Sequence, residues 1–118
     1  MLNSAEDAKV YLACGSTDLR KSIDGLAALV VTVFERDLFT HSLFVFCNRG
    51  RDKLKILRWD HNGFWLYYRR LEKGRFQWPD ATNPQPRAID RRQLQWLLDG
   101  LTLEQKQAHK PLTERCVL

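Results

Sequence analysis

The chain has 118 residues, of which 44% are hydrophobic and 28% are charged, and a formal net charge of +5. This length fits one domain, and the apolar content excludes an intrinsically disordered chain. No apolar run is long enough to span a bilayer, and residues 1–7 lack a signal-peptide pattern, so we expect a cytoplasmic protein. Neither a disulfide framework nor a zinc site is predicted, because the three cysteines are odd in number and widely spaced: Cys14, Cys47 and Cys116.

Two strands and one helix are predicted in the first half of the chain. Residues 9–14 form a short strand that Gly15 ends, and residues 43–47 form a continuously apolar strand that we expect to be covered on both faces. Between them, residues 16–18 offer helix caps, and apolar residues follow at helical spacing: Leu19, Ile23, Leu26, Val30 and Val33. We therefore expect an amphipathic helix of about four turns.

The start of this helix is also a candidate anion site. Arg20 and Lys21 fall in or just after its expected first turn, where backbone N–H groups attract phosphate. The Walker spacing is absent from this segment. A simple cap by Thr17 or Asp18 is the alternative, and the sequence leaves both interpretations open.

A tight hairpin is predicted around Asn62 and Gly63, because this residue pair suits a two-residue type I′ turn. Counting outward from the turn pairs His61 with Phe64 and Arg58 with Tyr67. Side chains alternate between faces, so one face is predicted to be core: Leu57, Trp59, Phe64, Leu66 and Tyr68. The other is predicted to be an open basic and aromatic surface: Arg58, Asp60, Trp65, Tyr67 and Arg69.

Positive charge is concentrated in this hairpin and its flanks. Residues 49–75 hold nine of the nineteen Lys and Arg residues and three acids, a net charge of +6, whereas the rest of the chain carries −1. Such asymmetry favours a nucleic-acid partner, with an ordinary solvated basic face as the alternative. The candidate contacts, besides Arg20 and Lys21, are Arg49, Arg51, Lys53, Lys55, Arg58, Trp65, Tyr67, Arg69, Arg70, Lys73 and Arg75.

The C-terminal part is predicted to be mostly loops and short helices. Residues 76–79 suggest a short strand or an extended arm, and residues 80–87 a loop. Asp90 is expected to cap a helix that ends at Gly100 and presents Leu94, Leu97 and Leu98 on one side. Thr102 and Gln105 fit the capping box of another short helix. We expect one domain over residues 1–110 and a loosely held tail over 111–118.

No catalytic, metal or cofactor site is predicted. The hairpin carboxylates of Asp52, Asp60 and Glu72 occupy a turn, the basic face and the far end of a strand, so they are not expected to converge on one metal. The histidines have no ligand spacing: His41, His61 and His109. We therefore expect a protein that is not an enzyme.

The fold class that these elements favour is α+β. We expect an antiparallel-dominated sheet of four or five strands, with the long helix packed on one face and short helices at the C-terminal end. A right-handed crossover through the long helix would pair the first two strands in parallel and make the sheet mixed.

Three long segments resemble the TnpB, or Orf2-like, accessory proteins of bacterial insertion sequences of the IS66 family. They are VYLACGSTDLRKSIDGLAALV, LFVFCNRGRDKLKILRWDHNGFWLYYRRLEKGRFQWP and RRQLQWLLDG. The first family signature falls on Gly15, Thr17, Asp18, Arg20 and Lys21. The second falls on Phe46, Asn48, Arg49, Arg51, Asp52, Lys55, Trp59, Asp60, Gly63, Trp65, Arg70, Leu71, Gly74 and Trp78. The chain departs from the usual pattern at Ser22, Gly50 and His61.

The resemblance implies an auxiliary factor that acts in transposition beside a separate transposase, and it supplies no catalytic residues. Two hypotheses follow. In the first, the protein binds DNA through the basic hairpin and the helix start. In the second, it is an adaptor without direct DNA contact, which binds the transposase or the other accessory protein of the element through Trp65, Tyr67 and Trp96. No membrane partner is expected, and the oligomeric state is open.

Overall fold

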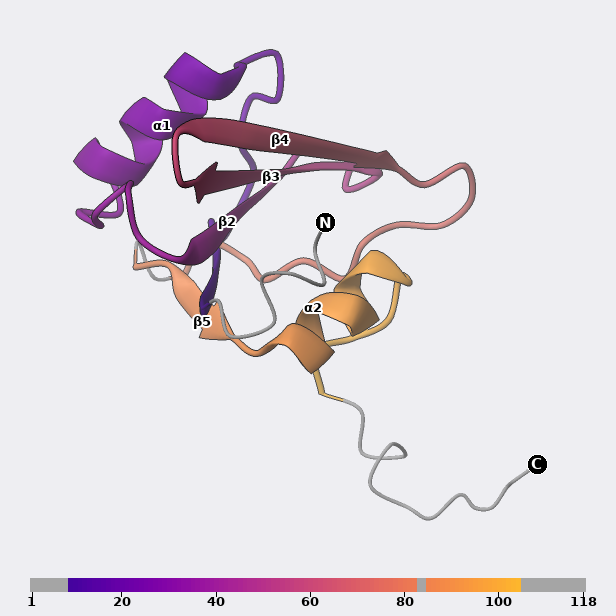
Figure 1. Ribbon diagram of the computed structural model, residues 1–118. Helices are drawn as coiled ribbons and strands as arrows, with labels where there is room; N and C mark the ends of the chain where they lie inside the picture. The colour runs from indigo at the N-terminus through magenta and orange to yellow at the C-terminus, as the bar shows by residue number, and fades with distance from the viewer. Residues whose placement is uncertain (1–8, 83–84, 105–118) are drawn as a thin grey trace.

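The computed structural model describes residues 9–82 and 85–104, which form a five-stranded mixed sheet with two helices (Figure 1). The strand order is β4-β3-β2-β1-β5, with β1 and β2 parallel and every other neighbouring pair antiparallel. The predicted α+β class and mixed sheet are confirmed. The elements are β1 (Lys9–Leu12), α1 (Ile23–Thr32), β2 (Ser42–Cys47), β3 (Lys53–Asp60), β4 (Gly63–Arg70), β5 (Arg87–Ile89) and α2 (Arg91–Leu98).

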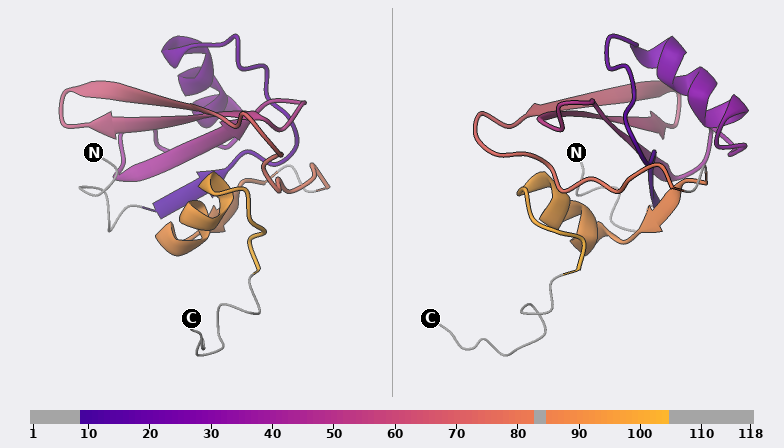
Figure 2. Two further views of the ribbon diagram at one scale, coloured as in Figure 1. Left: turned by 90° about the vertical axis from the view of Figure 1, so that its right-hand side faces the viewer. Right: turned by 180° about the vertical axis from the view of Figure 1, so that it is seen from behind.

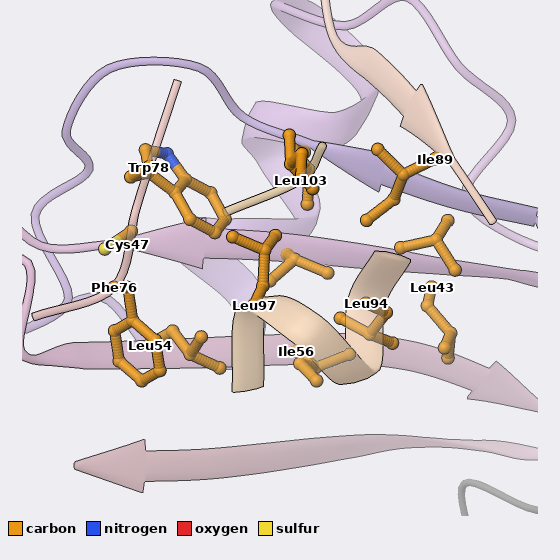
Figure 3. Close-up of a cluster of buried hydrophobic side chains, with 13 residues drawn as sticks. Leu43, Cys47, Leu54, Ile56, Phe76, Trp78, Ile89, Leu94, Leu97 and Leu103 are labelled. Atoms are coloured by element: carbon orange, nitrogen blue, oxygen red, sulfur yellow. The ribbon is translucent and has the colours of Figure 1, made fainter. Parts of the chain in front are cut away.

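The two helices cover opposite faces of the sheet, as the rotated views show (Figure 2). Leu26 and Val30 of α1 pack on one face, and Leu94 and Leu97 of α2 pack in the cluster on the other (Figure 3). Residues 43–47 of β2 alternate between the two clusters, and all six residues of the strand are buried. The prediction of a central strand covered on both faces is confirmed, which explains its continuous hydrophobicity.

The hairpin exists, but its turn lies one residue earlier than predicted. Asp60 pairs with Gly63, so His61 and Asn62 form the loop, and only His61 of these two has a positive φ, 58°. The type I′ turn and its register are therefore wrong, because Gly63 serves as the first residue of β4. Each β3 residue pairs with a residue two positions earlier on β4 than expected, as in Arg58 with Trp65. A shift of two preserves the predicted division into faces.

The long helix starts later than predicted and is shorter. It spans ten residues from Ile23, with Ser22 at the N-cap, so Arg20 and Lys21 precede it. The Lys55 ammonium donates to the carbonyl oxygens of Leu19 and Lys21. These two bonds hold residues 19–21 against β3 in a loop that precedes α1, so Leu19 keeps its helical spacing without being part of the helix.

The C-terminal predictions are partly confirmed. Asp90 caps α2 in a capping box with Gln93, and Gly100 follows its end with φ +80°. Residues 71–80 form an arm without strand structure, whereas β5 was missed because its three residues are too few to show a period. Residues 101–104 are not helical, and Thr102 donates to the Glu104 carbonyl. Gln105, His109, Cys116 and the tail 111–118 lie outside the described residues.

Within the described parts of the chain, no helix combines the length and apolar character that crossing a membrane requires.

Candidate nucleic-acid interface

The hairpin face predicted to be open is partly covered, with Arg58 buried, Tyr67 half-buried, and Trp65 and Arg69 exposed. Arg58 is only 7% exposed, and Tyr67 packs against the cluster that contains α2. The Arg69 Nε donates to the Leu98 carbonyl at the end of α2, at 2.9 Å. Trp65 is 44% exposed, and its indole N–H donates to Asp60. The prediction of one continuous open face is therefore wrong at Arg58 and Tyr67, since Arg58 is buried and Tyr67 packs against the cluster that contains α2, whereas Trp65 and Arg69 are exposed as predicted.

The opposite face of the hairpin carries a basic and aromatic surface at one end, where Tyr68 and Arg70 are exposed and Lys53 and Lys55 are half-buried. Lys53 pairs across the strands with Arg70, and Lys55 pairs with Tyr68. The expectation that Tyr68 belongs to the core is wrong, since it is 55% exposed. Farther along the same face, Leu57 and Leu66 pack beneath α1, so the helix leaves the Tyr68 end open.

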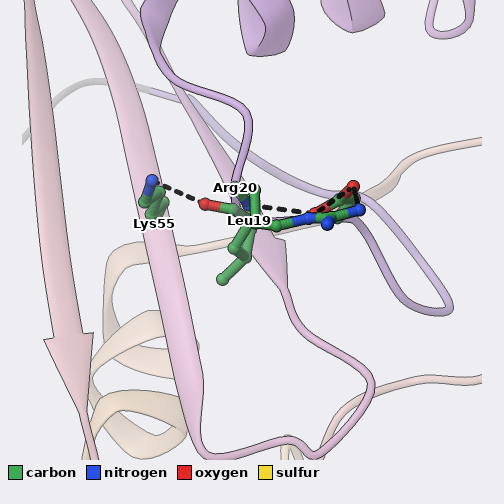
Figure 4. A network of polar contacts seen from close by, with 4 residues as sticks. Leu19, Arg20 and Lys55 are labelled. Atoms are coloured by element: carbon green, nitrogen blue, oxygen red, sulfur yellow. Dashed lines mark hydrogen bonds and ion pairs between the residues drawn. The ribbon is translucent and has the colours of Figure 1, made fainter.

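The loop before α1 borders this end of the hairpin. The Lys55 Nζ lies 2.7 Å from the Leu19 oxygen (Figure 4). It also lies 3.0 Å from the Lys21 oxygen, and the two bonds tie the loop to β3. Lys21 and Arg20 are both exposed. We use the name basic patch for Lys53, Tyr68 and Arg70 together with Arg20 and Lys21.

Asp18 is an ion-pair partner and not a helix cap. Its carboxylate accepts hydrogen bonds from the backbone N–H and the guanidinium of Arg20. These bonds lower the pKa of Asp18 to about 2. The Arg20 side chain remains 92% exposed, so the pair orients the guanidinium and leaves most of it open to solvent.

The turn between β2 and β3 is held by the side chains of Asn48 and Arg51. Asn48 belongs to the second family signature, and Arg51 was predicted to bind nucleic acid. Asn48 accepts from the N–H groups of Asp52 and Lys53 and donates to the Asp52 carboxylate, which lowers the pKa of Asp52. Arg51, with φ 60°, donates to the Trp78 carbonyl and to Asp80. Arg51 therefore secures the arm 71–80 to the turn.

Further exposed cations lie around this turn and arm. The arm is bound to the turn through two backbone hydrogen bonds, Leu71 N–H to the Asp52 oxygen and Phe76 N–H to the Arg51 oxygen. Three exposed cations in this region make no ion pair with any described residue: Arg49, Lys73 and Arg75. Arg70 pairs with Glu72 at 2.8 Å, which raises the pKa of the guanidinium. Further cations therefore lie beside the basic patch at this end of the sheet.

The segments that carry the two family signatures meet at one end of the sheet, because the parallel strands β1 and β2 both finish there. Thr17 N–H donates to the Cys47 oxygen, and Gly15 N–H donates to the Pro79 oxygen. The Trp78 indole N–H donates to the Ala13 oxygen at 2.9 Å. Residues from distant parts of the sequence therefore lie together at this end of the sheet.

Sequence reasoning missed Tyr68 as a surface residue. The alternation of Lys53, Lys55, Tyr68 and Arg70 on one face was available from the sequence. What could not be read locally is that α1 covers only the other end of that face. Among the described residues, no three His, Cys, Asp or Glu side chains are grouped in a way that could hold a metal ion.

Comparison with known proteins places this chain in a family. The family model described as IS66 Orf2 like protein matches residues 8–108. The uncharacterized protein y4hO of Sinorhizobium fredii (strain NBRC 101917 / NGR234) is 38% identical over 101 residues, covering 86% of this chain and 87% of that protein. The uncharacterized protein y4jC of the same strain is 30% identical over 79 residues, covering 67% and 68%. No solved structure matches the chain significantly. The chain therefore belongs to the IS66 Orf2-like family of insertion-sequence accessory proteins.

Proposed function

We propose that this accessory protein binds DNA through the basic patch and that the DNA it prefers has unpaired bases. The observation that carries the proposal is the exposed ring of Tyr68 on the same face as Lys53 and Arg70. An aromatic ring can stack on a splayed base while neighbouring cations neutralise phosphates. A base within an intact duplex offers no such face, so we expect single-stranded DNA to bind more tightly.

The proposed contacts differ from the predicted set. The phosphate contacts are assigned to cations at this end of the sheet, all of them exposed except the half-buried Lys53: Arg20, Lys21, Arg49, Lys53, Arg70, Lys73 and Arg75. Arg51, Lys55 and Arg58 are assigned to the fold, because the first two donate to backbone carbonyls and the third is buried. Phosphate contacts make affinity fall with salt, so the binding should weaken steeply as ionic strength rises.

The test is fluorescence anisotropy with a single-stranded oligonucleotide of roughly 20 bases, followed across a salt series. The double variant Lys53→Gln, Arg70→Gln removes two phosphate contacts and should reduce the slope of log K against log salt by about 1.4. The control Lys9→Gln, Arg92→Gln removes the same charge elsewhere, since Lys9 is at the opposite end of the sheet and Arg92 is on α2. Equal losses for both variants would refute the patch.

The ring of Tyr68 is tested separately. Tyr68→Ala should weaken single-strand binding about tenfold, whereas Tyr68→Phe keeps the stacking surface and should bind like the native protein. A wild-type protein that fails to bind the oligonucleotide at about 50 mM salt would refute the proposal altogether.

We further propose that the protein acts beside a separate transposase and has no catalytic role of its own. The adaptor hypothesis is supported by exposed aromatic surface away from the patch, at Trp65, which is 44% exposed, and Phe39, which is 59% exposed. It predicts co-purification with the transposase or the second accessory protein and no DNA binding by the isolated chain. Loss of that co-purification in Trp65→Ser and not in Tyr68→Ala would assign Trp65 to a protein contact.

A further inference from the structure

The outer edge of β4 is a long strand edge without a strand partner among the described residues. β4 is the first strand of the order β4-β3-β2-β1-β5 and has eight residues, whereas β5 at the other edge has three. Short edges are protected from pairing with other chains, and long aromatic edges promote it. The sequence of β4, GFWLYYRR, contains neither proline nor an acidic residue.

The hydrogen bonding of the hairpin shows which β4 groups point outward. The Leu71 N–H donates to the Asp52 oxygen. This pair, and every second pair of the hairpin counted from it, therefore exchanges hydrogen bonds between β3 and β4. Trp65, Tyr67 and Arg69 belong to those pairs. The backbone N–H and C=O groups of the alternating residues therefore face away from β3: Phe64, Leu66, Tyr68 and Arg70.

We propose that a second copy of this chain pairs with this edge in antiparallel orientation, with Leu66 opposite Tyr68 and Phe64 opposite Arg70. This register uses all four outward-facing residues on each copy and puts Tyr67 opposite its own symmetry mate. It makes two five-stranded sheets into one continuous ten-stranded sheet.

The charges and rings on β4 favour this arrangement over a parallel one. In the antiparallel register, Arg70 lies opposite Phe64 and Arg69 opposite Trp65, so each guanidinium meets an aromatic side chain of the other copy. In a parallel register, the two arginines of one copy would lie beside the same two arginines of the other. Like charges on neighbouring strands are destabilising, so the edge selects the antiparallel dimer.

The twofold axis of this dimer is perpendicular to the sheet and passes between the two Tyr67 residues. Both copies of α1 then lie on the same side, together with both copies of Lys53 and Tyr68. The dimer itself does not rest on the proposed function. Only its consequence does, namely that one DNA molecule meets two symmetry-related basic patches.

Sedimentation of the full chain without DNA tests the dimer. We expect twice the 13.9 kDa mass of one chain at micromolar concentration. Tyr68→Pro removes an outward N–H without removing a hydrogen bond to β3, so it should be monomeric, whereas Tyr68→Thr keeps that N–H and should remain dimeric. A monomeric wild type, or a dimeric Tyr68→Pro, would overturn the proposal.

Cysteine substitution tests the register and does not depend on the proline variant being folded. Tyr67→Cys places two thiols on the twofold axis in a non-hydrogen-bonded pair, whose Cα separation of about 4.5 Å permits a disulfide. Trp65→Cys puts its thiol opposite Arg69 and should not cross-link. A covalent dimer of Tyr67→Cys on a non-reducing gel supports the register, and equal cross-linking of both variants refutes it. Because neither measurement includes DNA, failure of the dimer and failure of DNA binding are separate results.

Discussion

Removing the ammonium of Lys55 should destabilise the protein without removing any of the proposed DNA contacts. In Lys55→Met the hydrophobic stem is kept, and the two donors to the carbonyl oxygens of Leu19 and Lys21 are lost. The loop before α1 then loses its side-chain anchor on β3.

The expected loss can be estimated from these two bonds. A hydrogen bond that involves a charged group contributes about 1.5–3 kcal/mol net when buried. The Lys55 side chain is only half-buried, so water can replace part of the lost bonding to both carbonyls. We therefore expect the free energy of unfolding to fall by about 2 kcal/mol, below the sum of two fully buried bonds.

The assay is urea unfolding followed by tryptophan fluorescence, analysed by linear extrapolation with a shared slope. Lys53→Met is the matched control, because Lys53 lies two residues earlier on the same face and makes no ion pair with any described residue. The control should change stability by less than about 0.5 kcal/mol. If Lys55→Met is as stable as Lys53→Met, the anchoring role of Lys55 is refuted.

Three further predictions concern single sites. Gly15→Ala should lower the free energy of unfolding by about 2 kcal/mol, because φ is +78° and the added Cβ would lie 2.6 Å from the Cβ of Ala81. The control Gly74→Ala, with φ +79° and no neighbour within 4 Å, should cost less in the same urea assay. NMR titration should give Asp18 a pKa of about 2, and the variant Arg20→Gln should return this pKa toward 3.8. Because folding lowers the pKa, the contribution of the Asp18–Arg20 pair to stability is complete above pH 3.8 and is lost as pH falls through about 2. Burial raises the pKa of Cys47 to about 11, so an alkylating reagent at about pH 8 should modify it only after unfolding; the stability gained by burying the neutral thiol is complete below its unfolded pKa and is lost as pH rises toward 11.

The fold was predictable where the signal is local. The apolar run of β2, the hairpin, and the cap of α2 at Asp90 each follow from neighbouring residues. The hairpin register and the start of α1 were not predictable in this way. For each of them the local sequence allows more than one arrangement, and distant contacts decide between the arrangements. Lys55 stabilises the loop at Leu19 across 36 positions of sequence, and no helical period reveals that contact.

The candidate site was predictable in composition and not in orientation. The charge excess of residues 49–75 includes most of the cations now assigned to the proposed interface, and strand alternation separates Arg58 from Tyr68 onto opposite faces. Which face is open depends on how far α1 and α2 extend over the sheet. Both helices are short, at ten and eight residues, so each leaves part of its face uncovered.

Positive charge in a family signature does not by itself identify a nucleic-acid contact. Arg51 and Lys55 both lie in the second signature, and both direct their charge to backbone carbonyls of segments distant in sequence. Lys53 lies between them, outside the signature, and makes no such bond to any described residue. A residue that fixes the loops around a binding surface is as sensitive to substitution as one that touches the ligand. The two roles are separated by measuring stability and affinity on the same variant, since loss of stability is expected for Lys55 and loss of affinity alone for Lys53.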